Sequence, residues 1–218
     1  MTSVTDTGTA GASGPSGGRS VDRRLIILWE AGALVVIVFV ASALHFLYEL
    51  SGFQPWATLF GSVNESTWEH LKLFYWPAFI YALVQHAYTR DRVNNFWWAK
   101  AAAIITAPLV LMFSFYFYLG ISLPMYGRGF LWADIGTGVL GVLVGNIVSY
   151  RIMTAPEMGK VFARAGLAIC VVVGAMFIAF TYYPPRIFIL ENFMRYKYSG
   201  EFGILKDYTP YLIFKKAV

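Results

Sequence analysis

The stretch "LIILWEAGALVVIVFVASALHFLY", residues 25–48, decides the class of fold, because its only acidic side chain is Glu30 and the rest is almost entirely apolar. A helix of about 20 such residues crosses the hydrocarbon core of a bilayer. The composition of the whole chain agrees, with 58% hydrophobic and 13% charged residues, whereas a soluble domain carries about 25% charged residues. The sequence therefore predicts an integral membrane protein of the all-α class.

Four further apolar segments are long enough to cross a bilayer. With the first span at 25–48, they predict a five-helix transmembrane bundle over residues 23–185, with the other spans near 64–88, 96–119, 129–150 and 161–183.

Both ends of the chain differ from the predicted bundle. Residues 1–22 are rich in Gly, Ser and Thr, and we expect them to form a disordered N-terminal tail. Residues 186–218 follow a pair of prolines and mix aromatic with charged side chains, so we expect an interfacial tail that lies along the membrane surface.

The net charge of +5 comes from basic residues that are scattered along the chain and flank the apolar spans. This pattern favours topology signals and contacts with membrane lipid over a nucleic-acid partner. The run "RSVDRR", residues 19–24, directly precedes the first span. Because basic residues near the first span tend to stay inside, we expect a cytoplasmic N-terminus.

Ionisable side chains gather at one predicted face of the membrane. Helix alternation brings together the end of span 25–48, the start of span 64–88 and the start of span 129–150, which carry His45, Glu49, Glu65, Glu69, His70, Lys72 and Asp134. Ionisable residues at membrane depth are costly and mark functional sites. We therefore expect a shared polar site at this face.

Two imidazoles and several carboxylates from different helices are suited to a divalent metal such as Zn. The candidate metal ligands are His45, Glu49, His70 and Asp134, and the candidate catalytic acid–base groups are Glu65, Glu69 and Lys72. A bound metal can activate water for hydrolysis, so one hypothesis is a metal-dependent membrane enzyme that acts on a lipid or a small amphiphile. The sequence has no HExxH, P-loop, GxSxG or SxxK motif.

Small residues in span 129–150 form one helical stripe that includes Gly138, Gly141 and Gly145 and begins at Asp134. Small residues let helices approach closely. We expect the stripe to face the bundle and to turn Asp134 inward. The same glycines are candidates for a helix–helix contact between copies of the chain.

Structural interpretations of the same residues stay open. Ser62 to Glu65 fits a helix-capping box, Glu69 and Lys72 fit a local ion pair, and Glu30 fits a bond to a neighbouring helix. Two further hypotheses follow: a non-catalytic membrane subunit whose polar cluster locks helices together, and a small proton- or cation-coupled carrier.

Three motifs carry a resemblance to a known family: "HFLYELSG" (45–52), "SVNESTWEHLK" (62–72) and "YYPPRIFIL" (182–190) followed by "YSGEFGI" (198–204). Over about residues 40–210 the chain resembles an uncharacterised family of small bacterial integral membrane proteins, a domain of unknown function. The resemblance implies a location in the bacterial inner membrane and supplies no activity.

Overall fold

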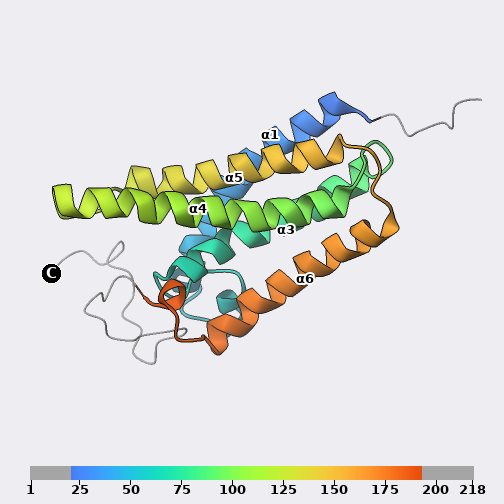
Figure 1. Ribbon diagram of the computed structural model, residues 1–218. Helices are drawn as coiled ribbons and strands as arrows, with labels where there is room; N and C mark the ends of the chain where they lie inside the picture. Colours follow the sequence, from blue (N-terminus) through green and yellow to red (C-terminus); the bar gives the residue numbers. More distant parts are fainter. Residues whose placement is uncertain (1–20, 193–218) are drawn as a thin grey trace, which may run out of the picture.

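A computed structural model describes residues 21–192, which form six α-helices and no strand (Figure 1). The elements in chain order are α1 (Arg23–His45), α2 (Leu47–Leu50), the 3-10 turn η1 (Pro55–Leu59), α3 (Thr67–Thr89), α4 (Phe96–Tyr126), α5 (Leu131–Met153), α6 (Lys160–Tyr182) and the 3-10 turn η2 (Phe188–Leu190). The prediction of an all-α fold is confirmed.

Four of these helices, α1, α4, α5 and α6, are long and apolar enough to cross a membrane. This finding indicates a membrane protein. Helix α3 has 23 residues and lies among the others, but it is not one of the four. Its first turn carries the polar residues of the second predicted span, which lowers its apolar content.

The start of α3 differs from the capping box expected at Ser62. The N-cap is Ser66, whose Oγ accepts a hydrogen bond of 3.2 Å from the backbone N–H of Glu69. Ser62 instead donates to the carbonyl oxygen of Asn64. The prediction of a cap at Ser62 was wrong because residues 62–66 turn before the helix begins, which leaves the Glu65 side chain for another contact.

Helix α4 is longer than the predicted span at 96–119, since it continues to Tyr126 over 31 residues. It ends where Gly127 adopts a left-handed conformation with φ +68°, which glycine tolerates without steric cost. Hydropathy predicts how much helix lies in the bilayer, whereas this glycine determines where the helix stops.

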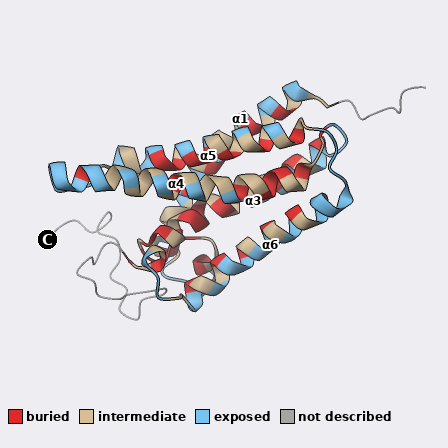
Figure 2. Cartoon of the chain, in the orientation of Figure 1, coloured by how far each residue is buried: buried red, intermediate tan, exposed pale blue. Residues whose placement is uncertain are grey.

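The long helices pack side by side around a shared interior. Helix α5 lies against α4 and α1, α3 lies against α1, and α6 lies against α4 (Figure 1). Buried residues line the inward sides of the helices and exposed residues lie outside (Figure 2). The exposed residues include large apolar side chains such as Phe39, Phe113 and Val161. An apolar exterior of this kind is suited to contact with lipid.

The predicted glycine stripe of α5 faces the bundle. A Cβ atom on Gly141 would lie 2.6 Å from the carbonyl oxygen of Ala107 in α4, and one on Gly145 would lie 3.1 Å from that of Ala103. Gly138 faces the ring of Phe74 in α3. Contact between copies of the chain through these glycines stays a prediction.

The predicted tails lie mostly outside the described residues. Asp22 is the exception at the N-terminal end, where its carboxylate caps α1 by accepting a hydrogen bond of 3.0 Å from the N–H of Leu25. Residues 186–192 are the described part of the C-terminal tail and include η2.

We predict that Gly141→Ala lowers the free energy of unfolding by about 1–3 kcal/mol, the usual cost of overpacking a close contact. Gly136→Ala in the same helix is the matched control, because nothing lies within 4 Å of a Cβ atom there. Thermal unfolding in detergent measures both variants. Equal stability of the two would contradict the close approach of α5 and α4.

Candidate metal centre

The loop before α3 holds Glu65 in place through backbone contacts. Asn64 Oδ1 accepts a hydrogen bond of 2.8 Å from the N–H of Ser66. The N–H of Glu65 donates to Asn192 Oδ1 at 3.2 Å. The Asn-Glu-Ser run therefore forms a fixed turn and a helix cap, and it presents the Glu65 carboxylate at the end of the bundle.

Glu65 lies between two imidazoles from different helices. Its Oε1 lies 3.5 Å from Nε2 of His45 at the end of α1, and its Oε2 lies 3.4 Å from Nε2 of His70 in α3. One ligand atom from each of the three residues can be chosen so that all lie within 4.8 Å of one another. Within residues 21–192 this group has the spacing to hold a metal ion.

The three side chains are partly accessible. The exposed fraction is 18% for His45, 17% for Glu65 and 35% for His70. The group therefore lies at the edge of the packed bundle and is partly open to its surroundings.

Ser66 orients the ring of His70. Nδ1 of His70 lies 2.8 Å from the carbonyl oxygen of Ser66. A carbonyl oxygen only accepts, so Nδ1 carries the proton in this contact. Metal-ligating histidines commonly donate their second ring N–H to a carbonyl or carboxylate in this way. Nε2 is then left for a metal or, when protonated, for Glu65.

Charge favours an ionised Glu65. Burial alone would raise the pKa of this carboxyl, but the His70 and His45 imidazoles outweigh the burial, and the pKa lies below its ordinary value. The carboxylate is therefore ionised at neutral pH beside a protonated His70, and a metal would displace an imidazole proton on binding.

Asp134 and Glu49, the other predicted ligands, are not in this group of three. Asp134 lies in the first turn of α5 and interacts electrostatically with His70 and Glu65. The Tyr118 hydroxyl lies beside it and donates to the Phe130 carbonyl oxygen at 3.3 Å. Asp134 Oδ1 is buried without a hydrogen-bond partner. Glu49 lies in the short helix α2 and also has a buried, unpartnered Oε2. Asp134 is therefore beside the group, while Glu49 shows no contact with it.

Glu69 and Lys72 form a separate buried network. Lys72 Nζ lies 2.5 Å from Glu69 Oε2 and also donates to the carbonyl oxygen of Thr58 at 2.8 Å. Thr181 Oγ1 donates to Glu69 Oε1 at 2.8 Å, and the N–H of Val63 donates to Glu69 Oε2 at 3.1 Å. The local ion pair expected from the spacing is confirmed. It connects η1, the loop before α3, α3 itself and α6.

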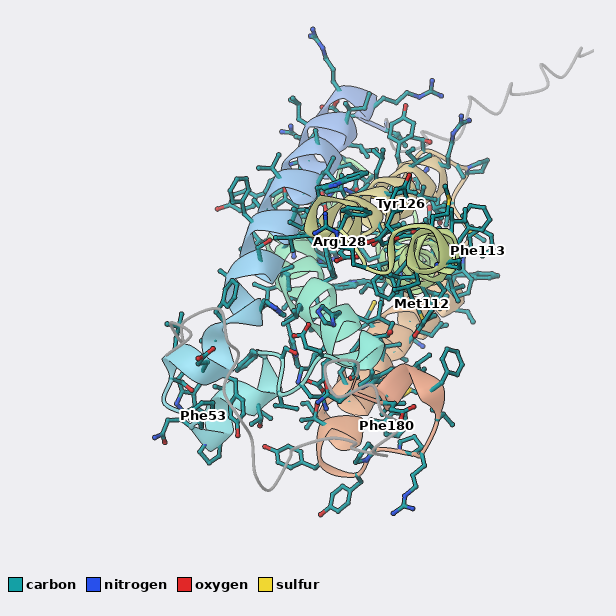
Figure 3. The ribbon with its side chains drawn as sticks, turned by 90° about the vertical axis from the view of Figure 1, so that its left-hand side faces the viewer. Phe53, Met112, Phe113, Tyr126, Arg128 and Phe180 are labelled. Carbon is teal, nitrogen blue, oxygen red and sulfur yellow. The ribbon has the colours of Figure 1, made fainter. Side chains whose placement is uncertain are left out.

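Figure 3 views the bundle from the end at which α4 stops, with Arg128 of the α4–α5 turn near the middle of the view and Phe53 of the loop after α2 at its lower left. The contacts of Glu65 with His45 and His70 confirm that the end of α1 and the start of α3 meet. Asp134 at the start of α5 is within electrostatic range of His70 and Glu65.

Sequence reasoning missed three partners: Thr58, Thr181 and Tyr118. Thr58 supplies a carbonyl oxygen to Lys72, Thr181 supplies a hydroxyl to Glu69, and the Tyr118 hydroxyl lies beside Asp134. Their signal in the sequence is weak, because a single Thr or Tyr near a span end is ordinary.

Lys100 was missed as well, since its place near a predicted span end resembled a topology signal. In the structure it is a buried partner of Glu30, and the predicted bond of Glu30 to a neighbouring helix is confirmed.

Residues 24–204 match the model of a protein family described as a family of unknown function, DUF6512. The chain belongs to DUF6512. No curated protein and no solved structure matches it. Membership confirms the resemblance to an uncharacterised family and adds no activity, so function must be argued from the residues of the site.

We predict that Lys72→Met lowers the free energy of unfolding by about 3–5 kcal/mol, because it leaves the Glu69 carboxylate buried without its cation. The same substitution at exposed Lys160 is the control. Chemical or thermal unfolding in detergent measures the difference. A Lys72 variant as stable as the Lys160 variant would show that the pair does not hold the bundle together.

Proposed function

We propose that this member of DUF6512 is a membrane-embedded metal protein in which His45, Glu65 and His70 bind a divalent ion such as Zn, and that the site hydrolyses a lipid or a small amphiphile. The observation that carries the proposal is the spacing of the three ligands. Imidazole and carboxylate ligands bind zinc at about 2.0–2.1 Å, so two ligands of a tetrahedral ion lie roughly 3.3 Å apart. Nε2 of His45 lies 3.5 Å from Glu65 Oε1, and Nε2 of His70 lies 3.4 Å from Glu65 Oε2. One ligand atom from each residue can be chosen so that all three lie within 4.8 Å of one another, so a bound ion would draw the three side chains slightly closer together.

The number of ligands also supports a reactive site. Catalytic zinc ions keep three protein ligands and leave the fourth position to water or substrate, whereas structural zinc ions are held by four. His45, Glu65 and His70 supply three, and their partial exposure leaves space for a fourth ligand from outside. A metal in this position would supply an activated water for attack on an ester.

Asp134 is our candidate for the general base. Its carboxylate lies within electrostatic range of His70 and Glu65, and the Tyr118 hydroxyl lies beside it. The unpartnered Oδ1 is available to accept a proton. Glu69 is less suited to this role, because both of its carboxylate oxygens already accept hydrogen bonds within the buried network. Glu49, an expected ligand, would need a movement of α2 to join.

We further propose that α3 is a fifth span, that the membrane is the bacterial inner membrane, and that the N-terminus lies in the cytoplasm. The family resemblance and the basic run before α1 support these points. In this arrangement the site lies at the level of the lipid headgroups on the opposite side, where a lipid ester can reach it.

A non-catalytic polar lock is the second candidate. It is favoured by the Glu69–Lys72 network, in which every charged group already has a partner. Under this alternative, Glu65 and His70 form an ion pair that needs no metal. The carrier hypothesis has less support, because the cavity among the helices is lined mostly by apolar residues.

We expect the purified wild-type protein to hold about one zinc ion per chain, and His70→Ala and Glu65→Gln to lose at least about tenfold in metal affinity. His86→Ala in α3 is the control, because this imidazole lies against Phe96 and Trp97 at centroid distances of 5.0 and 5.1 Å and is not in the site. Elemental analysis and competition with a chromogenic chelator measure the effect. If the wild-type protein stays free of metal after attempts to reload it, the metal proposal fails and the polar lock becomes the explanation of the site.

Activity separates the roles of the carboxylates. In mixed micelles of detergent and ester lipid, chelation should abolish hydrolysis and zinc should restore it. We expect Asp134→Asn to lower kcat by about 100-fold or more, the usual contribution of a general base, with zinc content unchanged. Glu69→Gln tests the earlier expectation that Glu69 is catalytic. A loss of kcat in that variant without loss of stability would show that Glu69 takes part in the reaction.

A further inference from the structure

An apolar groove lies on the outer side of the bundle between α1 and α3, and its volume is about 460 Å³. Two stripes of residues spaced by four form its walls: Val36, Val40 and Leu44 on α1, and Trp76, Ile80 and Val84 on α3. Residues four apart share one face of a helix, so each stripe runs along its helix. Val40 and Ile80 are 39% and 52% exposed. The groove is therefore open toward the surroundings of the bundle, which are lipid for a membrane protein.

One end of the groove lies beside the candidate metal site. Leu44 in α1 directly precedes His45, which contacts Glu65. Leu47 also lines the groove, and a Cβ atom on Gly61 would lie 3.0 Å from the Leu47 Cβ and 3.1 Å from the carbonyl oxygen of Leu44. Gly61 belongs to the loop that continues to Glu65. The same end of α1 and the same loop therefore form both the end of the groove and the site.

The other end of the groove is closed, because α1 and α3 touch there. A Cβ atom on Gly32 would lie 2.8 Å from the Tyr81 hydroxyl, which donates to the carbonyl oxygen of Trp29 at 2.9 Å. The part of the groove from Val36 to Leu44 runs about 12 Å at the rise of an α-helix. The hydrocarbon part of one leaflet is about 15 Å deep, half of the bilayer core. The groove is therefore as long as most of one leaflet.

The chemistry of the lining selects the occupant. The groove is lined by aliphatic and aromatic side chains and one proline, so a polar or charged molecule would find no partner along it. An extended peptide would bring backbone N–H and C=O groups that this lining cannot satisfy. A hydrocarbon chain has no such groups, and only its polar end needs partners, which are present at the site end of the groove.

We propose that the groove holds the acyl chain of an ester lipid, with the ester group at the Leu44 end beside His45. The inference rests on the proposed hydrolase and narrows its substrate. The acyl chain reaches along most of one leaflet, so the substrate is a membrane lipid rather than a short-chain amphiphile.

Photo-labelling tests the occupant. The probe is a monoacyl phosphatidylcholine with a photoreactive diazirine in its acyl chain, added to the full-length protein in detergent micelles, and mass spectrometry identifies the labelled residues. We expect the label to concentrate on the groove residues of α1 and α3. We also expect its loss in Ile80→Trp, because the larger side chain fills the groove.

Val172→Trp on α6 is the matched control. Val172 is 57% exposed and lies nine residues from Thr181, which bonds Glu69. Ile80 lies eleven residues from Glu69 on α3, so the two positions have similar depth in the bundle. We expect Val172→Trp to leave the labelling of the groove unchanged.

Two results would overturn the proposal. Equal labelling of the exposed faces of α3 and α6, or labelling that survives Ile80→Trp, would show only the general contact of an apolar surface with amphiphiles. Weaker labelling of the groove than of α6 would show that a second copy or another segment of this chain covers it.

The labelling requires neither a metal nor hydrolysis, so it separates this inference from the proposed function. A labelled groove in a protein that binds no zinc would keep the acyl-chain site and reject the hydrolase. Zinc-dependent hydrolysis with an unlabelled groove would keep the hydrolase and reject the acyl-chain site. With both present, we expect Ile80→Trp to raise KM for the ester lipid by about fivefold or more, as for an overpacked site, with zinc content unchanged. An unchanged KM would contradict the acyl-chain site.

Discussion

The ion pair between Glu69 and Lys72 is the interaction on which the candidate site depends. Glu69 accepts from the N–H of Val63, and this bond holds the loop that carries Glu65. Lys72 reaches the Thr58 carbonyl oxygen in η1 and Thr181 in α6. Because two buried charges must be fully paired, these contacts leave the loop little freedom. The position of Glu65 between the imidazoles follows from that constraint.

The sequence contained enough information to predict the helices but less to predict their partners. Apolar length is a local property, so the cores of α1, α4, α5 and α6 were predictable. The sharing of one face by His45, His70 and Asp134 was also predictable, because helix alternation decides it. The ends of helices depend on single residues, and α4 runs on until Gly127 ends it.

Pairings between distant elements were not predictable from one sequence. Glu30 and Lys100 are 70 positions apart, and nothing local indicates that they meet at 2.6 Å. Glu65 could have capped a helix, and only the turn at residues 62–66 directs it to the imidazoles instead. Two of the predicted ligands lie outside the group of three: Asp134 is beside it in α5, and Glu49 is in the separate short helix α2.

The Glu69–Lys72 network and the group of Glu65 with its two imidazoles differ in a way that bears on function. The Glu69–Lys72 network has a donor for both carboxylate oxygens, so it has no need of a ligand. The Glu65 carboxylate does not make comparably short contacts. Its oxygens lie farther from the two imidazole nitrogens than the about 2.7–2.9 Å of a strong charge-assisted hydrogen bond. Distances of 3.4 and 3.5 Å are too long for an optimised ion pair. The three ligand atoms lie within 4.8 Å of one another, so small side-chain movements would bring them around a metal ion. A purely structural lock would have been expected to shorten these contacts, as the neighbouring pair does at 2.5 Å.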